Sequence, residues 1–288
     1  MESGLILVDK PQGFTSHDVV AKLRKQLGTK KIGHAGTLDP MATGLLLLGV
    51  NSGTKLLQFL VGADKQYLAT IRLGQSSSTD DAEGELSEVR DAGSITVDQI
   101  ELELSKLRGE ISQVPSSVSA IKLDGKRAYD LVREGKEVVL TSRQVNIYRF
   151  EILGEPKVVG KFIDLDVVVD CSSGTYIRAL ARDLGAALKV GGHLTALRRT
   201  LIGNYSVADS FELGQGARVT DMVSAARALF DLVELTKEQA KDIVHGKRIK
   251  LSGSEQLGAL YQGELLGVLV RAGDEYRSLQ VFPEVLNG

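Results

Sequence analysis

Hydrophobic residues recur along the chain with two different periods. Short apolar or alternating runs predict buried and half-buried strands, and apolar residues three or four positions apart predict amphipathic helices. The runs that predict strands cover residues 5–10, 45–50, 67–73, 145–152 and 162–169. The stretches with helical spacing cover residues 16–27, with Ser16 as the expected N-cap, 56–60, 97–107, 179–188 and 219–233.

The hydrophobic pattern changes near residue 233. From there the chain has one short helical stretch and then three short apolar runs, 257–261, 265–271 and 276–282, separated by glycine turns. This pattern predicts a small, mostly β domain over 233–288 that follows a larger domain over 1–232. A length of 288 residues is sufficient for both.

One polar loop carries candidate chemistry. Residues 33–44 (GHAGTLDPMATG) combine glycines and Pro40, which prevent a regular helix or strand, with His34 and Asp39. The loop is followed at once by the apolar run 45–50, and an acid on a loop beside a stiff strand is a common form of reactive site. Asp-Pro is also a frequent turn, so the loop alone leaves both interpretations open.

A second polar stretch, about residues 109–139, is rich in turn formers and ends in basic residues. Connections of this length usually have a function of their own. The net charge of −2 does not exclude a nucleic-acid partner, because lysines and arginines gather in 22–31, 122–133 and 198–199, whereas acids gather in 80–103. A basic face and a mixed, solvated surface are both consistent with this distribution.

Several classes of protein are disfavoured by the composition. The single cysteine, Cys171, excludes an internal disulfide and suits a reducing, cytoplasmic compartment. The four histidines are scattered and none pairs with Cys171, so we expect no metal. No apolar run is long enough to cross a bilayer, and residues 1–4 do not resemble the start of a signal peptide.

Four motifs occur in a fixed order along the chain. They are VDKPxG at 8–13, GHxGxLDPxAxG at 33–44, DKxY at 64–67 and CSxGTYIR at 171–178. Together they resemble the TruB family of tRNA pseudouridine synthases over essentially the whole chain, and the second motif is the most specific. Residues 119–129 resemble the RNA-gripping insertion of that family, although Ser116 stands where the family often has a proline. The segment 233–288 resembles a PUA domain.

The resemblance implies an α+β protein with the pseudouridine-synthase fold, in which helices flank a central mixed, largely antiparallel sheet. It also implies the reaction. The uridine at position 55, in the TΨC loop of tRNA, would be isomerised to pseudouridine: uracil is detached from its ribose, turned and rejoined through C5. The broken bond supplies the energy of the new one, so no cofactor is needed. The implied partner is the T-arm stem-loop of tRNA, without an obligate protein partner.

By the same resemblance, Asp39 matches the nucleophile of the family. An aspartate is ionised at neutral pH unless burial penalises its charge, so the chemistry requires a cation beside it. Arg178 matches the residue that pairs with the nucleophile, and the fork of a guanidinium suits this task. A structural ion pair between Arg178 and another acid, such as Asp81, is the alternative.

The target base must leave the folded RNA before it can react, so we expect base flipping. Tyr67 matches the tyrosine that stacks on the flipped base and is the candidate to take the C5 proton. Tyr176 and Leu197 match residues of the substrate pocket, although core packing would explain Leu197 equally well. His34 matches the residue that fills the gap left in the RNA by the flipped base.

Two other functions remain open from the sequence. The same surface would serve a tRNA-binding or tRNA-folding chaperone in which catalysis is secondary. A hydrolase that uses Asp39 on a nucleoside bond would need a second carboxylate as its base, and the sequence places none that we expect to lie nearby.

Overall fold

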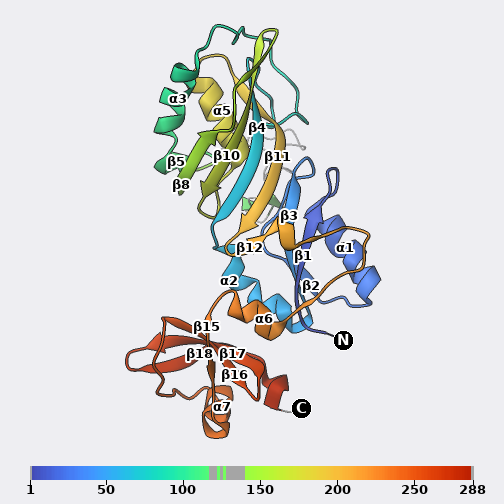
Figure 1. Ribbon diagram of the computed structural model, residues 1–288, viewed down its shortest axis with the longest axis vertical. Helices are drawn as coiled ribbons and strands as arrows, with labels where there is room; N and C mark the ends of the chain where they lie inside the picture. The colour runs from blue at the N-terminus through green and yellow to red at the C-terminus, as the bar shows by residue number, and fades with distance from the viewer. Residues whose placement is uncertain (1, 117–121, 124–125, 128–139, 287–288) are drawn as a thin grey trace.

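Figure 1 shows the computed structural model, which describes residues 2–116, 122–123, 126–127 and 140–286. The described chain forms one large sheet with helices packed on it, one small sheet near the C-terminus, and a short ladder of β6 (Lys122–Leu123) with β7 (Lys126–Arg127). The predicted α+β class is confirmed. Among the described helices, none has the length and apolarity that crossing a membrane requires.

The large sheet is mixed and largely antiparallel, as predicted. Its main path runs in the order β13-β1-β3-β11-β4-β10-β8-β5, and only the contacts β1–β13 and β3–β11 are parallel. The strands are β1 (Gly4–Lys10), β2 (Ile32–His34), β3 (Thr43–Val50), β4 (Lys65–Leu73), β5 (Gly109–Gln113), β8 (Arg143–Ile152), β9 (Lys157–Val159), β10 (Phe162–Cys171), β11 (Gly192–Ile202), β12 (Tyr205–Ser206), β13 (Phe211–Glu212) and β14 (Thr220–Asp221).

The helices cover selected parts of this sheet. They are α1 (Ser16–Leu27), α2 (Gln58–Val61), α3 (Val97–Lys106), α5 (Ile177–Ala187), α6 (Met222–Arg227) and α7 (Lys237–Val244), with 3-10 turns η1 (Asn51–Leu56), η2 (Val207–Asp209) and η3 (Pro283–Leu286). In Figure 1, α3 and α5 lie against one side of the half formed by β4, β10 and β8. The N-cap of α1 is Thr15, whose side chain accepts from the Asp18 N–H in a capping box, and not Ser16 as predicted.

Burial follows the layers on each side of the sheet. In β4, buried residues alternate with more exposed ones, because only one face of this strand is covered by helices. In β3, every residue from Gly44 to Val50 is buried. Leu46 and Leu48 pack into the core shared with α1, whereas Leu45 and Leu47 pack with η1, α2 and α6. This double burial explains why the run 45–48 consists entirely of leucine.

The two halves of the large sheet meet through a very short parallel contact. Thr43 and Gly44, at the start of β3, pair with Arg198 and Arg199 in β11. Gly44 has a φ of +97°, and a Cβ atom at this position would collide with the carbonyl oxygen of Arg199. The loop 33–44 therefore ends where the halves join, and the glycine is required by this close backbone approach.

The small sheet has the order β15-β16-β17-β18 and carries α7. Its strands are β15 (Asp231–Glu234), β16 (Gln256–Tyr261), β17 (Glu264–Ala272) and β18 (Glu275–Val281). Leu265, Val268 and Phe282 pack into the same hydrophobic cluster as Leu56 and Leu60 of the first part of the chain. The small sheet is thus joined to the rest by a shared apolar core.

Three predictions about secondary structure are wrong or incomplete. The stretch 219–233 is not one helix: Asp221 caps the short α6, and β15 begins at Asp231. The apolar residues there pack into the same cluster from a helix and from a strand, which makes the two periods hard to separate. The hydrophobic pattern predicts no helix or strand at 193–199, which lies in β11, or at 109–113, which forms β5. Most of the predicted insertion, 109–139, lies outside the described residues.

The close approach at Gly44 predicts a large effect of a methyl group there. Gly13 has a similar φ of +82° but open space around it, so it serves as a matched control. We expect Gly13→Ala to lower the free energy of unfolding by about 1–2 kcal/mol, from the backbone conformation alone. Gly44→Ala should lower it by more than about 4 kcal/mol, because the backbone of β11 must also move. Urea unfolding measures both, and equal losses would contradict the close approach.

Candidate active site

The main chain of the loop that carries Asp39 is held on both sides of the aspartate. The Ser16 hydroxyl accepts from the Leu38 N–H at 2.9 Å and donates to the Leu38 carbonyl at 3.2 Å. The Gly13 N–H donates to the Pro40 carbonyl at 2.8 Å. Because its neighbours in the chain are fixed, Asp39 projects from a defined backbone position.

The side chain of Lys10 holds the same loop through hydrogen bonds. Its side chain is fully buried, and its ammonium group donates to three main-chain carbonyls, at 3.0 Å to Pro11, 2.7 Å to Phe14 and 3.3 Å to Pro40. Burial lowers the pKa of Lys10 to about 8, and the negative charge of Asp39 opposes this shift. Lys10 is therefore a structural support of the loop that also places a cation near Asp39.

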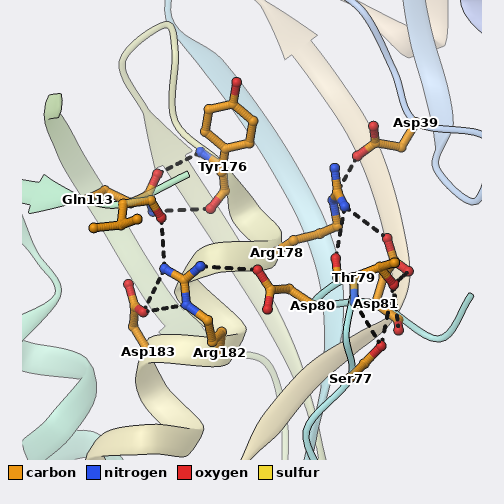
Figure 2. A network of polar contacts seen from close by, with 11 residues as sticks. Asp39, Ser77, Thr79, Asp80, Asp81, Gln113, Tyr176, Arg178, Arg182 and Asp183 are labelled. Atoms are coloured by element: carbon orange, nitrogen blue, oxygen red, sulfur yellow. Dashed lines mark hydrogen bonds and ion pairs between the residues drawn. The ribbon is translucent and has the colours of Figure 1, made fainter. Parts of the chain in front are cut away.

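Arg178, in the first turn of α5, lies between two carboxylates from different segments (Figure 2). Its Nε is 2.9 Å from Asp39 Oδ2, and its Nη1 is 3.2 Å from Asp81 Oδ2. Nη1 also donates to the Thr79 carbonyl at 2.8 Å. The side chains of Arg178 and Asp81 are only 5% and 4% exposed, whereas that of Asp39 is 37% exposed. Both contacts considered from the sequence are present together.

The acidic loop around Asp81 is itself ordered by hydrogen bonds. Thr79 Oγ1 donates to Asp81 Oδ1 at 2.5 Å, and the Glu83 N–H donates to the same atom at 3.1 Å. The pKa of Glu83 is raised by partial burial and by the charges of Asp81 and Asp39. The expectation that no second carboxylate lies near Asp39 is therefore wrong. The sequence could not reveal this, because the loop folds back onto α5 from a distant part of the chain.

Tyr176 precedes α5, and its main chain is fixed by a side chain from β5 (Figure 2). The buried amide of Gln113 donates to the Tyr176 carbonyl at 3.1 Å and accepts from its N–H at 2.9 Å. The Arg143 guanidinium lies 5.7 Å from the centre of the Tyr176 ring. These contacts hold the ring beside the start of α5, where Arg178 also emerges.

A cavity of about 330 Å³ joins most of the predicted site residues. Its lining includes Asp39, Tyr67, Tyr176, Arg178 and Leu197. This volume lies at the lower end of the range found for small-molecule sites. Five side chains that the sequence separates by up to 158 positions thus face one space, formed by the loop 33–44, β4, β11 and the start of α5.

His34 is the predicted residue that does not line this cavity. It lies in β2, opposite Leu48 of β3, and its ring packs edge-to-face against His17 of α1, with 5.6 Å between the ring centres. Gly36, two residues further along the chain, does line the cavity, so His34 is close to the cavity without belonging to its lining.

Two cations that line the cavity were not identified from the sequence. Arg199 of β11 donates through Nε to the Leu45 carbonyl at 2.8 Å, and Lys65 begins β4. Both side chains are buried. Lys65 belongs to the DKxY motif and Arg199 to a basic pair, so the residues were visible, but the pattern did not show that β4 and β11 place them in one cavity.

Burial keeps two other groups protonated. It raises the pKa of the Tyr67 phenol, and the positive charge of the nearby Arg199 partly opposes this shift. It also raises the pKa of the Cys171 thiol to about 12. Cys171 is therefore a packed, unreactive residue. Among the described residues, no group of three or more His, Cys, Asp or Glu side chains could hold a metal ion.

Two family models match the chain. The TruB family pseudouridylate synthase (N terminal domain) matches residues 24–177, and the tRNA pseudouridylate synthase B C-terminal domain matches residues 178–233. The chain is 52% identical to tRNA pseudouridine synthase B of Leifsonia xyli, over 98% of this chain and 97% of the relative. It is 50% identical to tRNA pseudouridine synthase B of Paenarthrobacter aurescens, over 98% and 96%.

The fold is also similar to that of a solved structure described as a Cbf5-Nop10-Gar1 complex. The match covers 96% of this chain and 84% of the other, with a TM-score of 0.69 and 25% identity. Together with the family matches, this confirms the fold expected from the four motifs.

The buried position of Arg178 predicts a large effect on stability. Arg178→Met would leave Asp81 buried without its cation, which should lower the free energy of unfolding by about 3–5 kcal/mol. Arg149→Met, which breaks an exposed and solvent-screened pair with Glu151, is the control and should cause a much smaller loss. In a double-mutant cycle followed by urea unfolding, adding Asp81→Asn to Arg178→Met should recover part of the loss. Equal losses for the two arginine variants would exclude a stabilising buried pair.

Proposed function

The chain belongs to the TruB family of pseudouridylate synthases, and we propose that it isomerises the uridine at position 55, in the TΨC loop of tRNA, to pseudouridine. Two relatives that match nearly its full length are tRNA pseudouridine synthases, and the enzyme class follows from them. The proposed partner is the T-arm stem-loop, and we expect the enzyme to act in the cytoplasm. No cofactor enters the proposed reaction.

The observation that carries this proposal is the position of Asp39. Its carboxylate faces the cavity and is accessible, its backbone is held by Ser16 and Gly13, and Arg178 lies 2.9 Å away. Because Asp81 and Thr79 fix the guanidinium from the other side, the cation does not have to be ordered when the substrate arrives. A nucleophilic or basic carboxylate that is ionised and aimed into the site is what attack at C1′ or C6 of the uridine requires.

The cavity is suited to one flipped pyrimidine. We propose that the target base enters it, with Tyr67 stacked on one face and Tyr176 and Leu197 in contact with the base. The raised pKa of Tyr67 means that its phenol is protonated beforehand. To take the C5 proton, it would first have to give up its own proton, which its raised pKa disfavours and the nearby Arg199 favours. His34, beside the cavity, is proposed to fill the gap that the base leaves in the RNA.

The remaining parts of the chain are proposed to hold the RNA. We propose that residues 233–288 form a PUA-like RNA-binding domain and that the insertion at about 109–139 grips the T-arm. Lys55, next to the small sheet, donates to the Val281 carbonyl at 3.3 Å and lies 5.4 Å from the centre of the Phe282 ring. This contact and the shared core support a fixed orientation of the small sheet.

Asp39→Asn separates an enzyme from a chaperone. It removes the charge and keeps the shape, so pseudouridine formation should fall below detection while tRNA binding stays within about threefold of wild type. Asp183→Asn, on α5 but outside the cavity lining, is the matched control and should keep full activity. Mapping of pseudouridine in tRNA incubated with each purified variant measures the outcome. Normal turnover by Asp39→Asn would refute the mechanism.

Binding should depend on salt, because backbone phosphates supply most of the affinity for RNA. We expect the tRNA affinity to fall at least about tenfold between 50 and 200 mM salt. Replacing Lys22, Lys25, Lys30 and Lys31 by Gln should lower the slope of log affinity against log salt by about 1 for each lysine that contacts a phosphate. Lys106→Gln, in the acidic region on α3, should leave the slope unchanged. A slope that stays at its wild-type value in the four-lysine variant would remove this cluster from the RNA-binding face.

A further inference from the structure

Two buried cations line the cavity in addition to the Asp39–Arg178 pair. The side chains of Lys65 and Arg199 are 9% and 1% exposed, and both belong to the cavity lining. The mechanism described above uses neither of them. Burying a charge is costly unless it is paired, so two such groups in one site require an explanation.

Main-chain carbonyls fix these cations without neutralising them. Lys65 Nζ donates to the Val61 carbonyl at 3.2 Å and to the Ala63 carbonyl at 2.5 Å. Arg199 Nη2 donates to the Gly36 carbonyl at 3.3 Å. In the described part of the chain, neither side chain forms a salt bridge with a carboxylate. An ammonium group has three N–H donors, so Lys65 keeps one for a ligand.

The two cations converge on the loop that carries Asp39. A Cβ atom at Gly36 would lie 3.6 Å from Arg199 Nη1 and 3.9 Å from Lys65 Cε. Burial and the charge of Arg199 lower the pKa of Lys65 to about 8. Like charges that a fold holds close together in a cleft are typical of functional sites, because their repulsion does not stabilise the folded chain.

The positively charged side chains of the cavity lining therefore outnumber the negatively charged ones. Asp39 is the one carboxylate among the described lining residues, and it already contacts Arg178. Lys65 and Arg199 remain as excess positive charge, and Arg199 lies beside Tyr67, on which the base is proposed to stack. A ligand that becomes negative inside the cavity would compensate this excess.

We propose that Lys65 and Arg199 form an oxyanion subsite that stabilises the uracil ring when it becomes anionic during the reaction. The inference rests on the proposed function. If a carboxylate oxygen of Asp39 bonds to C1′, the C1′–N1 bond breaks and its electron pair stays on the ring, delocalised over N1 and O2. If the oxygen bonds to C6, the C5–C6 π pair moves towards O4. In both routes the base carries the negative charge, and preorganised cations stabilise it.

A phosphate of the RNA is the other anion that could occupy this subsite, and rate and affinity distinguish the two. Lys65→Met keeps the length of the side chain and removes its charge, whereas Lys65→Arg keeps a charge. For an anionic base we expect Lys65→Met to lower the single-turnover rate constant about 100-fold with unchanged tRNA affinity, and Lys65→Arg to restore at least part of the rate. A loss confined to affinity would assign the subsite to a phosphate and overturn the proposal.

A substrate with a more acidic base provides a second test. The fluorine of 5-fluorouridine withdraws electrons and stabilises negative charge on the ring. We expect the Lys65→Met variant to consume 5-fluorouridine in a T-arm stem-loop with a smaller rate defect than it shows for uridine. Nucleoside analysis of the RNA after single-turnover reactions measures both. Equal defects would mean that Lys65 does not act on charge in the base.

Binding of free bases tests the subsite without any turnover. Barbiturate is a pyrimidine anion at neutral pH, and uracil is its neutral counterpart. In NMR titrations we expect wild type to bind barbiturate more tightly than uracil, and Lys65→Met to lose this preference while its thermal midpoint stays at or above that of wild type. No preference in wild type would overturn the subsite. If wild type makes no pseudouridine but prefers barbiturate, the proposed function fails and the subsite stands.

Discussion

The site depends on one shared cation, the guanidinium of Arg178. Asp81 and the Thr79 carbonyl hold it from the buried side, and Asp39 contacts it from the accessible side. A buried carboxylate and a buried arginine are each costly alone, so each makes the other possible. The same contact joins three distant segments: the loop 33–44, the acidic loop after β4 and the first turn of α5. Removing the arginine would therefore disturb the architecture as well as the chemistry.

The large sheet brings these segments together at a short contact between β3 and β11, which we call the joint. β3 and β11 are parallel neighbours only at Thr43 and Gly44, so the loop that carries Asp39 ends where the two halves of the sheet meet. Arg199 lies at this joint and extends into the cavity, and its guanidinium holds the carbonyls of Leu45 and Gly36. Packing at the joint and geometry at the site are thus set by the same residues, which leaves little freedom to adjust one without the other.

The sequence predicts much of this structure because local and global signals agree there. The alternation in 67–73 and the all-leucine run 45–48 reflect burial directly, and both became strands. Residues 193–199 gave no clear signal, because a strand that buries Arg199 against carbonyls does not show an apolar period. The motif containing Asp39 identified the loop, but the contacts of Asp81 and Lys65 with the site depend on chain segments that only the fold brings together.

The charged side chains of the lining polarise the cavity, which its shape alone would not do. One accessible carboxylate lies at Asp39, and two buried cations, Lys65 and Arg199, lie where they are held by carbonyl oxygens. In the proposed reaction, in which charge moves from the carboxylate into the bound base, dipoles and charges fixed in this way would need no reorganisation. Burial and, after it, the repulsion from Arg199 lower the pKa of Lys65, so holding both cations is costly for the fold. The cavity is therefore polarised before a substrate binds. An apolar pair at these positions would remove both the repulsion and the polarisation, and it would leave the carbonyls of Leu45 and Gly36 without these donors.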